Sequence, residues 1–272
     1  MLSAEELASY HEHGFVVCPD LVPRAACDAL NGHLSTVIAA VAAEYVAGVR
    51  REIGFWELMA RSRGGLEVFW DPSRGSPHTG LAAATMRVGH ALHAVDPTFG
   101  AFCAVPAIRS RLRQTVGEPG TVLQSAIIYK QPRSEAVQFG MHQDASYLTT
   151  EPESLALAFV ALDDMTPRNG CLEVIPGSHR SGLEVTLTMG PTGFVPTTVR
   201  ARGKRGRADA VPLVVGRGAV IFVHGRTFHG SEPNRSDGPR RALILHAMSA
   251  RSRLATTSWI LEGGKRPACA SL

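Results

Sequence analysis

Residues 216–243 read GRGAVIFVHGRTFHGSEPNRSDGPRRAL, and this stretch decides the fold. Its apolar, β-branched run at 219–223 follows a glycine and predicts a short buried strand. A turn rich in Gly, Ser, Pro and Asn comes next, and a second apolar run at 242–248 predicts another strand. Short strands separated by such turns are typical of a β-sandwich or barrel.

The residues before this stretch divide into a β half and a helical half. Further short apolar runs predict strands at 121–129, 155–162, 172–175 and 211–215. Helical patterns lie at 3–12, 24–47, 81–92 and 98–116, with one strand predicted at 15–18. In the first helix Ser3 is a suitable N-cap, and Glu6 completes a capping box.

We therefore expect a mainly β fold with N-terminal helices packed on its core. Residues 1–272 are predicted to form one domain, with mainly helical support at 1–120 and the β core at 121–250. Residues 181–210 show no strong periodicity, and a loop of that length inside a compact domain predicts a lid over a site.

Composition restricts the location and the partners of the chain. It has 272 residues, 19% of them charged, and a net charge of +4. No run of 18 apolar residues and no signal-like N-terminus occur, so we expect no membrane-spanning helix and no membrane partner. Five cysteines without a CxxC pair favour a reducing, cytoplasmic compartment.

A small basic cluster raises the question of nucleic-acid binding. Arg202, Lys204, Arg205 and Arg207 lie close together, but no aromatic residues are interleaved with them. The cluster is short and rich in glycine, so a solvated loop is expected and no nucleic-acid partner. A small molecule is the expected substrate, and the sequence leaves the oligomeric state open.

His142-Gln143-Asp144 is the pattern most suggestive of chemistry. In an extended segment, residues two apart point to the same face, so an imidazole and a carboxylate would converge. With one distant histidine they would form a 2-His-1-carboxylate triad, the ligand set of non-haem Fe(II) oxygenases. His229, 87 residues further on, follows a predicted strand, although His224 and His246 also qualify by residue type.

Three runs then make a family resemblance visible. They are YKQPRSEAVQFGMHQDASYL at 129–148, NGCLEVIPGSHRSG at 169–182, and the 216–243 stretch quoted above. Together with YHEHGFVVCPDLV at 10–22, they resemble the phytanoyl-CoA dioxygenase family of iron- and 2-oxoglutarate-dependent oxygenases. The resemblance covers most of the chain and implies a double-stranded β-helix, or jelly-roll (cupin-like), core.

The resemblance also implies roles for individual residues. His142, Asp144 and His229 would ligate Fe(II), and Arg240, 11 residues after His229, would bind the distal carboxylate of 2-oxoglutarate. Ser231 would assist Arg240. Phe159 stands where many relatives carry a tryptophan beside the cosubstrate.

The implied activity is that of an Fe(II)/2-oxoglutarate-dependent dioxygenase, a hydroxylase that uses 2-oxoglutarate and O2 as cosubstrates. It would hydroxylate a C–H bond of a small molecule, a secondary metabolite or an acyl derivative, and release succinate and CO2. Two alternatives stay open. A cupin-type metal hydrolase or isomerase uses the same three ligands, and a non-catalytic sensor of metal or 2-oxoglutarate would keep the site without turnover.

Overall fold

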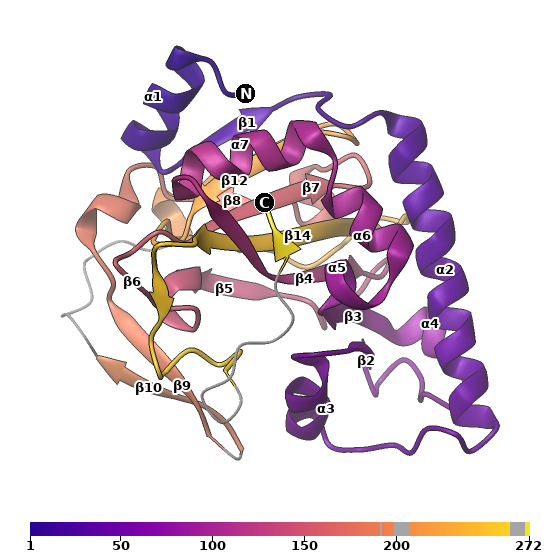
Figure 1. The fold of residues 1–272 in the computed structure, drawn as a ribbon. Coiled ribbons are helices and arrows are strands. Elements are labelled where there is room, and N and C mark those ends of the chain that lie inside the picture. The colour runs from indigo at the N-terminus through magenta and orange to yellow at the C-terminus, as the bar shows by residue number, and fades with distance from the viewer. Residues whose placement is uncertain (191, 199–206, 262–269) are drawn as a thin grey trace.

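The computed structural model describes residues 1–190, 192–198, 207–261 and 270–272. Two antiparallel sheets form the centre of the described part (Figure 1). The larger sheet has the strand order β1 (Phe15–Cys18), β12 (Val220–His224), β7 (Ala156–Ala161), β14 (Arg240–Ser249), β4 (Gly120–Lys130), β3 (Thr85–His90) and β2 (Leu66–Trp70), and β16 (Ala270–Ser271) also pairs with β4. The smaller sheet has the order β11 (Val211–Pro212), β8 (Glu173–Val174), β13 (His229–Ser231) and β5 (Phe139–His142).

Side chains of the larger sheet alternate between two apolar layers, as the period of a strand requires. In β7, Ala158 and Val160 pack in a core cluster with residues of the helices, whereas Leu157 and Phe159 pack against residues of the smaller sheet. Every residue of β7 is buried, so the strand is covered on both faces. A strand covered on both faces reads as a continuous apolar run, which is the pattern of 155–162.

Helices cover the outer face of the larger sheet (Figure 1). The helices of the described residues are α1 (Ala4–His13), α2 (Arg24–Val46), α3 (Phe55–Ser62), α4 (Leu81–Ala84), α5 (Leu92–Val95), α6 (Pro97–Cys103) and α7 (Pro106–Val116). α1 begins with the predicted capping box, since Ser3 and Glu6 bond each other's backbone N–H groups. This layer leaves the inner face of the sheet free to build a site with β5, β8 and β13.

α2 is long and apolar enough to cross a membrane by length and composition alone. Its residues Leu30, Leu34 and Ile38 are buried in the core that it shares with the larger sheet. A helix that packs one face on a protein core passes the same test, so the feature is weak support for a membrane span.

Several predicted elements are present and others are wrong. Residues 81–92 do not form one helix, because α4 ends at Ala84 and the chain continues as strand β3. The helix predicted at 98–116 is two helices, separated where Pro106 begins α7. A proline lacks the N–H that a continuous helix needs at that point.

The segment 181–210 also differs from the irregular loop that was expected. In its described part, β9 (Val185–Gly190) and β10 (Gly193–Thr198) pair as an antiparallel hairpin. Arg202, Lys204 and Arg205 of the basic cluster lie outside the described residues, as do residues 191 and 199–206 of the proposed lid. Arg207 is described, and it forms ion pairs with Glu173 and Glu232.

Candidate active site

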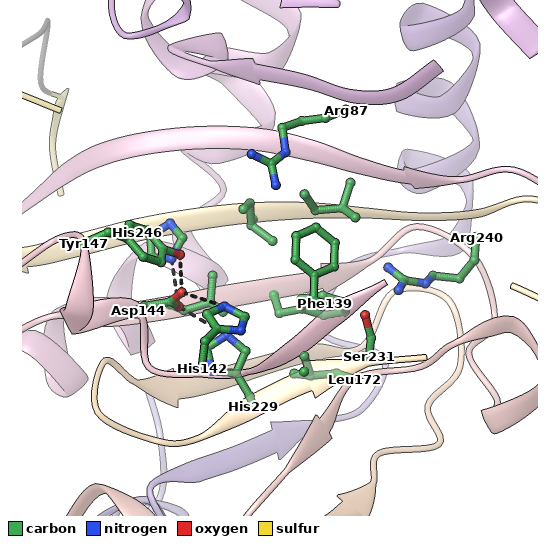
Figure 2. Close-up of a pocket in the computed structure, with 15 residues that line it drawn as sticks. Arg87, Phe139, His142, Asp144, Tyr147, Leu172, His229, Ser231, Arg240 and His246 are labelled. Carbon is green, nitrogen blue, oxygen red and sulfur yellow. Dashed lines mark hydrogen bonds and ion pairs between the residues drawn. The ribbon is translucent and has the colours of Figure 1, made fainter. Parts of the chain in front are cut away.

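A cluster of two histidines and one aspartate lies between the two sheets (Figure 2). His142 ends β5, Asp144 begins a short 3-10 turn two residues later, and His229 begins β13. β13 pairs with β5 so that His229 stands opposite His142. The Nε2 atoms of His142 and His229 each lie 3.5 Å from an oxygen of Asp144.

Both imidazoles are oriented by backbone carbonyls. Nδ1–H of His142 donates to Gly140 O at 2.8 Å, and Nδ1–H of His229 donates to Thr227 O at 2.9 Å. Each ring therefore carries its proton on Nδ1 and turns the lone pair of Nε2 toward Asp144. A hydrogen bond of this kind on the second nitrogen is the usual companion of a metal-binding histidine.

The protonation states also suit metal binding. Burial lowers the pKa of His229 to about 4, so its imidazole is neutral at physiological pH. Burial alone would raise the pKa of Asp144, but the imidazoles of His229, His246 and His142 outweigh it and hold that pKa well below its usual range. Burial alone would lower the pKa of His142, but Asp144 outweighs it and raises that pKa, so this ring gives up a proton when a metal binds. Two imidazole nitrogens and one carboxylate at these separations fit a divalent ion about 2.1 Å from each ligand.

Gly230, directly after His229, allows the two strands to approach closely. A Cβ atom at this position would stand 2.7 Å from Phe139 O and 3.0 Å from the sulfur of Met141. Any side chain here would push β13 away from β5 and separate the two histidines, so the position requires glycine.

Arg240 occupies the other end of the same pocket (Figure 2). Its side chain enters from the start of β14 and is 1% exposed, and burial lowers its pKa to about 10, so it stays charged. Nη2 donates to Gly170 O at 2.6 Å, while Nε and Nη1 have no hydrogen-bond partner among the described residues. Gly170 adopts the left-handed conformation with φ of 72°, which places its carbonyl at this position.

Ser231 and Phe159 line the pocket beside Arg240. The guanidinium carbon of Arg240 lies 5.9 Å from the ring centroid of Phe159, within cation–π range. Arg241, the next residue, points away and forms a bidentate ion pair with Asp163. The alternation of a strand thus sends one arginine into the pocket and the other out of it.

The structure adds residues that the sequence reasoning missed. His246 Nε2 lies 2.9 Å from Asp144 Oδ2, and the hydroxyl of Tyr147 donates to Asp144 Oδ1. Arg87 of β3 lines the pocket with no acidic partner among the described residues, and burial lowers its pKa. Reading 81–92 as a helix hid Arg87, because only a strand next to β4 brings it to the inner face.

A second, larger cavity of about 420 Å³ continues from the pocket toward the β9–β10 hairpin. The two share Arg87, Phe139, His142, Tyr147 and Ile244. The rest of the larger cavity is lined by Met59, His90, Gln124, Gln138, Gly140, Met141, Ser146, Leu187, Phe194 and Trp259. It is an apolar, aromatic chamber with neutral polar groups, open to a molecule next to the His–Asp–His cluster.

Comparison with solved structures shows which class of fold this is. A non-haem α-ketoglutarate-dependent carbocyclase, SnoK from nogalamycin biosynthesis, aligns with a TM-score of 0.63 at 22% identity, over 96% of this chain and 94% of that one. EctD from S. alaskensis, with 2-oxoglutarate and 5-hydroxyectoine, gives a TM-score of 0.68 at 21% identity, over 97% and 82%. The predicted fold class, a jelly-roll core with helices, is confirmed.

Sequence comparison then identifies the family. The family model of phytanoyl-CoA dioxygenase (PhyH) matches residues 10–242. Phytanoyl-CoA dioxygenase domain-containing protein 1 of Bos taurus is 30% identical over 284 residues, covering 98% of this chain and 95% of that protein. The chain belongs to the phytanoyl-CoA dioxygenase family, as the three sequence runs predicted, and within it the chain is similar to the domain-containing protein 1 group.

Proposed function

We propose that this chain is an Fe(II)- and 2-oxoglutarate-dependent dioxygenase that hydroxylates a C–H bond of a small, largely apolar molecule. One observation carries the proposal: a buried His–Asp–His cluster and a buried, incompletely bonded arginine face the same pocket. The first arrangement suits a divalent metal, and the second suits a carboxylate.

We assign His142, Asp144 and His229 as the metal ligands. They supply two neutral nitrogens and one anionic oxygen, and such a facial set leaves positions open for a cosubstrate and O2. When bound, Fe(II) and 2-oxoglutarate supply the oxidising power, with release of succinate and CO2. The chain orients both imidazoles through Gly140 O and Thr227 O, so that both Nε2 atoms face the metal position.

We assign Arg240 to the distal carboxylate of 2-oxoglutarate. Its Nε and Nη1 have no partner among the described residues, so the buried guanidinium keeps N–H donors free for the oxygens of a carboxylate. Ser231 and Phe159 complete this end of the pocket, the first as a hydroxyl and the second as an aromatic wall. Arg87 places a second unpaired cation on the cavity side, where it suits another anionic group of the bound molecules.

The larger cavity supports a small-molecule substrate. Its volume of about 420 Å³ lies within the usual range for small-molecule sites. Phe139, Tyr147, Phe194 and Trp259 give it an aromatic lining suited to a secondary metabolite or an acyl chain. We also expect a cytoplasmic location, because the four cysteines in the described residues are free and buried.

Anaerobic addition of Fe(II) and then 2-oxoglutarate tests the assignment directly. Chelation of Fe(II) by 2-oxoglutarate gives a visible charge-transfer band, and exposure to O2 should then produce succinate slowly even without substrate. Asp144→Ala is the matched negative control. A band without succinate would favour the sensor, and neither band nor succinate in a protein that binds metal would favour the hydrolase or isomerase.

A further inference from the structure

His246 bonds the carboxylate of Asp144 without belonging to the His–Asp–His cluster. Its ring is 1% exposed, and Nε2 lies 2.9 Å from Asp144 Oδ2 (Figure 2). Tyr147 donates to the other oxygen, Oδ1. Each oxygen of Asp144 therefore has a hydrogen-bond donor from outside the cluster, and the plane of the carboxylate is fixed by the protein.

Gln124 continues the contact on the other side of His246. The two residues stand opposite each other in the ladder between β4 and β14, and Gln124 Nε2 lies 2.9 Å from His246 Nδ1. An ionised carboxylate only accepts hydrogen bonds, so His246 donates from Nε2 and its Nδ1 accepts from the amide of Gln124. Both hydrogen bonds are donated toward Asp144: Gln124 donates to His246, and His246 donates to Asp144.

The far end of this chain of bonds reaches the larger cavity. Gln124 lines that cavity and is 2% exposed, yet its Oε1 has no hydrogen-bond partner within the described part of the chain. Ser146 lines the same cavity, and no described residue bonds its buried hydroxyl. A buried acceptor without a donor is destabilising, which favours an occupant that supplies the missing hydrogen.

We propose that Gln124 and His246 act as positioning residues that hold Asp144 in its metal-binding orientation, and that the substrate donates a hydrogen bond to Gln124 Oε1. The substrate class is thus a mainly apolar molecule that carries a hydroxyl or an amide N–H. This inference rests on the proposed function and deepens it, because it connects occupancy of the cavity to a metal ligand.

Three substitutions of His246 separate positioning from mere packing. The amide nitrogen of glutamine stands near the place of imidazole Nε2, whereas that of asparagine stands near Nδ1. His246→Gln therefore keeps a donor for Asp144, His246→Asn keeps only the contact to Gln124, and His246→Leu removes both. His224→Leu is the control for loss of a partly buried histidine, since His224 contacts Tyr10 and His179 instead.

The readouts are the Kd for Mn(II), measured by calorimetry, and the charge-transfer band of the anaerobic Fe(II)–2-oxoglutarate complex. We expect His246→Asn and His246→Leu to weaken Mn(II) binding by about 10- to 100-fold, as loss of such supporting contacts does elsewhere. They should also shift the band, while His246→Gln and His224→Leu remain close to wild type. Equal Kd values and bands in all four variants would overturn the positioning role.

The same data separate this inference from the proposed function. If wild type binds Mn(II) but gives no band with Fe(II) and 2-oxoglutarate, the proposed function fails. The positioning role is then decided by the Mn(II) affinities alone. Thermal melting of the metal-free variants shows whether each one is folded.

The substrate contact is tested with a pair of probes, 2-naphthol and its methyl ether, which differ in the hydroxyl hydrogen. We expect 2-naphthol to bind the Mn(II)–2-oxoglutarate form about tenfold more tightly than the ether, as one neutral hydrogen bond allows. Gln124→Met should remove that preference while it still binds the ether. Equal affinity of wild type for the two probes, or no binding of either, would overturn this contact.

Discussion

The two ends of the pocket are built in opposite ways. At the His–Asp–His end the chain supplies an anion, Asp144, and gives each of its oxygens a hydrogen-bond donor. At the other end it supplies a cation, Arg240, two of whose nitrogens have no partner among the described residues. The first end suits a metal ion, whereas the second suits an anion that no described residue provides. A ligand with a carboxylate completes the second end.

The largest effect is expected at the completed end. Asp144→Ala removes the only charged side chain of the proposed ligand set and leaves two imidazoles, so metal binding and succinate formation should both be lost. Calorimetry with Mn(II) and a succinate assay measure the two losses. Asp144→Glu should keep part of the metal affinity, but displacement of the oxygen by roughly 1 Å should lower turnover about 100-fold. Wild-type turnover in Asp144→Ala would show that Asp144 is not a ligand.

A smaller and different effect is expected at the arginine end. Arg240→Ala should raise the KM for 2-oxoglutarate at least 30-fold, because loss of a buried charge partner costs about 2–5 kcal/mol. The Kd for Mn(II) should stay unchanged, since Arg240 lies at the far end of the pocket. Arg241→Ala is the matched control, because Arg241 pairs with Asp163 outside the pocket. An unchanged KM in Arg240→Ala would show that Arg240 does not bind the carboxylate of 2-oxoglutarate.

The sequence predicted the proposed ligands better than the contacts that support them. The proposed ligands stand in short local patterns, HxD and a histidine after an apolar strand, which local chemistry makes recognisable. Their supporting contacts depend on pairing between distant strands: His246 meets Gln124 only through the β14–β4 register. Arg87 was missed because LAAAT before it favours a helix, whereas pairing of β3 with β4 makes residues 85–90 a strand. Short sequence patterns thus identify candidate ligands, whereas the pairing of distant strands determines which residues support them.

The β9–β10 hairpin borders the larger cavity. Its hydrogen exchange should slow when ligands bind in the pocket and in the cavity. Phe194 of β10 contacts Trp56 and Tyr147, and Leu187 of β9 lines the cavity. Filling the site with Mn(II) and 2-oxoglutarate should slow hydrogen exchange in the described hairpin strands, with a further decrease when 2-naphthol is added. The centre of β4 serves as the internal reference. Unchanged exchange in both strands would remove the proposed lid role of this segment.

The smallest effect concerns His224, a partly buried histidine that lies outside the pocket, five residues before His229. Burial first, and then the charges of His179 and Arg226, lower its pKa to about 3. In the unfolded chain His224 binds a proton near pH 6.5, whereas in the folded protein it stays neutral at that pH. Its contribution to the free energy of unfolding is therefore complete above this pH and decreases as the pH falls below it. Between pH 6.5 and 5.5 wild type should lose roughly 1 kcal/mol more than His224→Gln. Urea unfolding at both pH values measures the difference, with the exposed His13→Gln as control. Parallel losses in wild type and His224→Gln would show that burial does not keep this ring neutral, and the neutrality inferred for His229 from the same cause would lose its support.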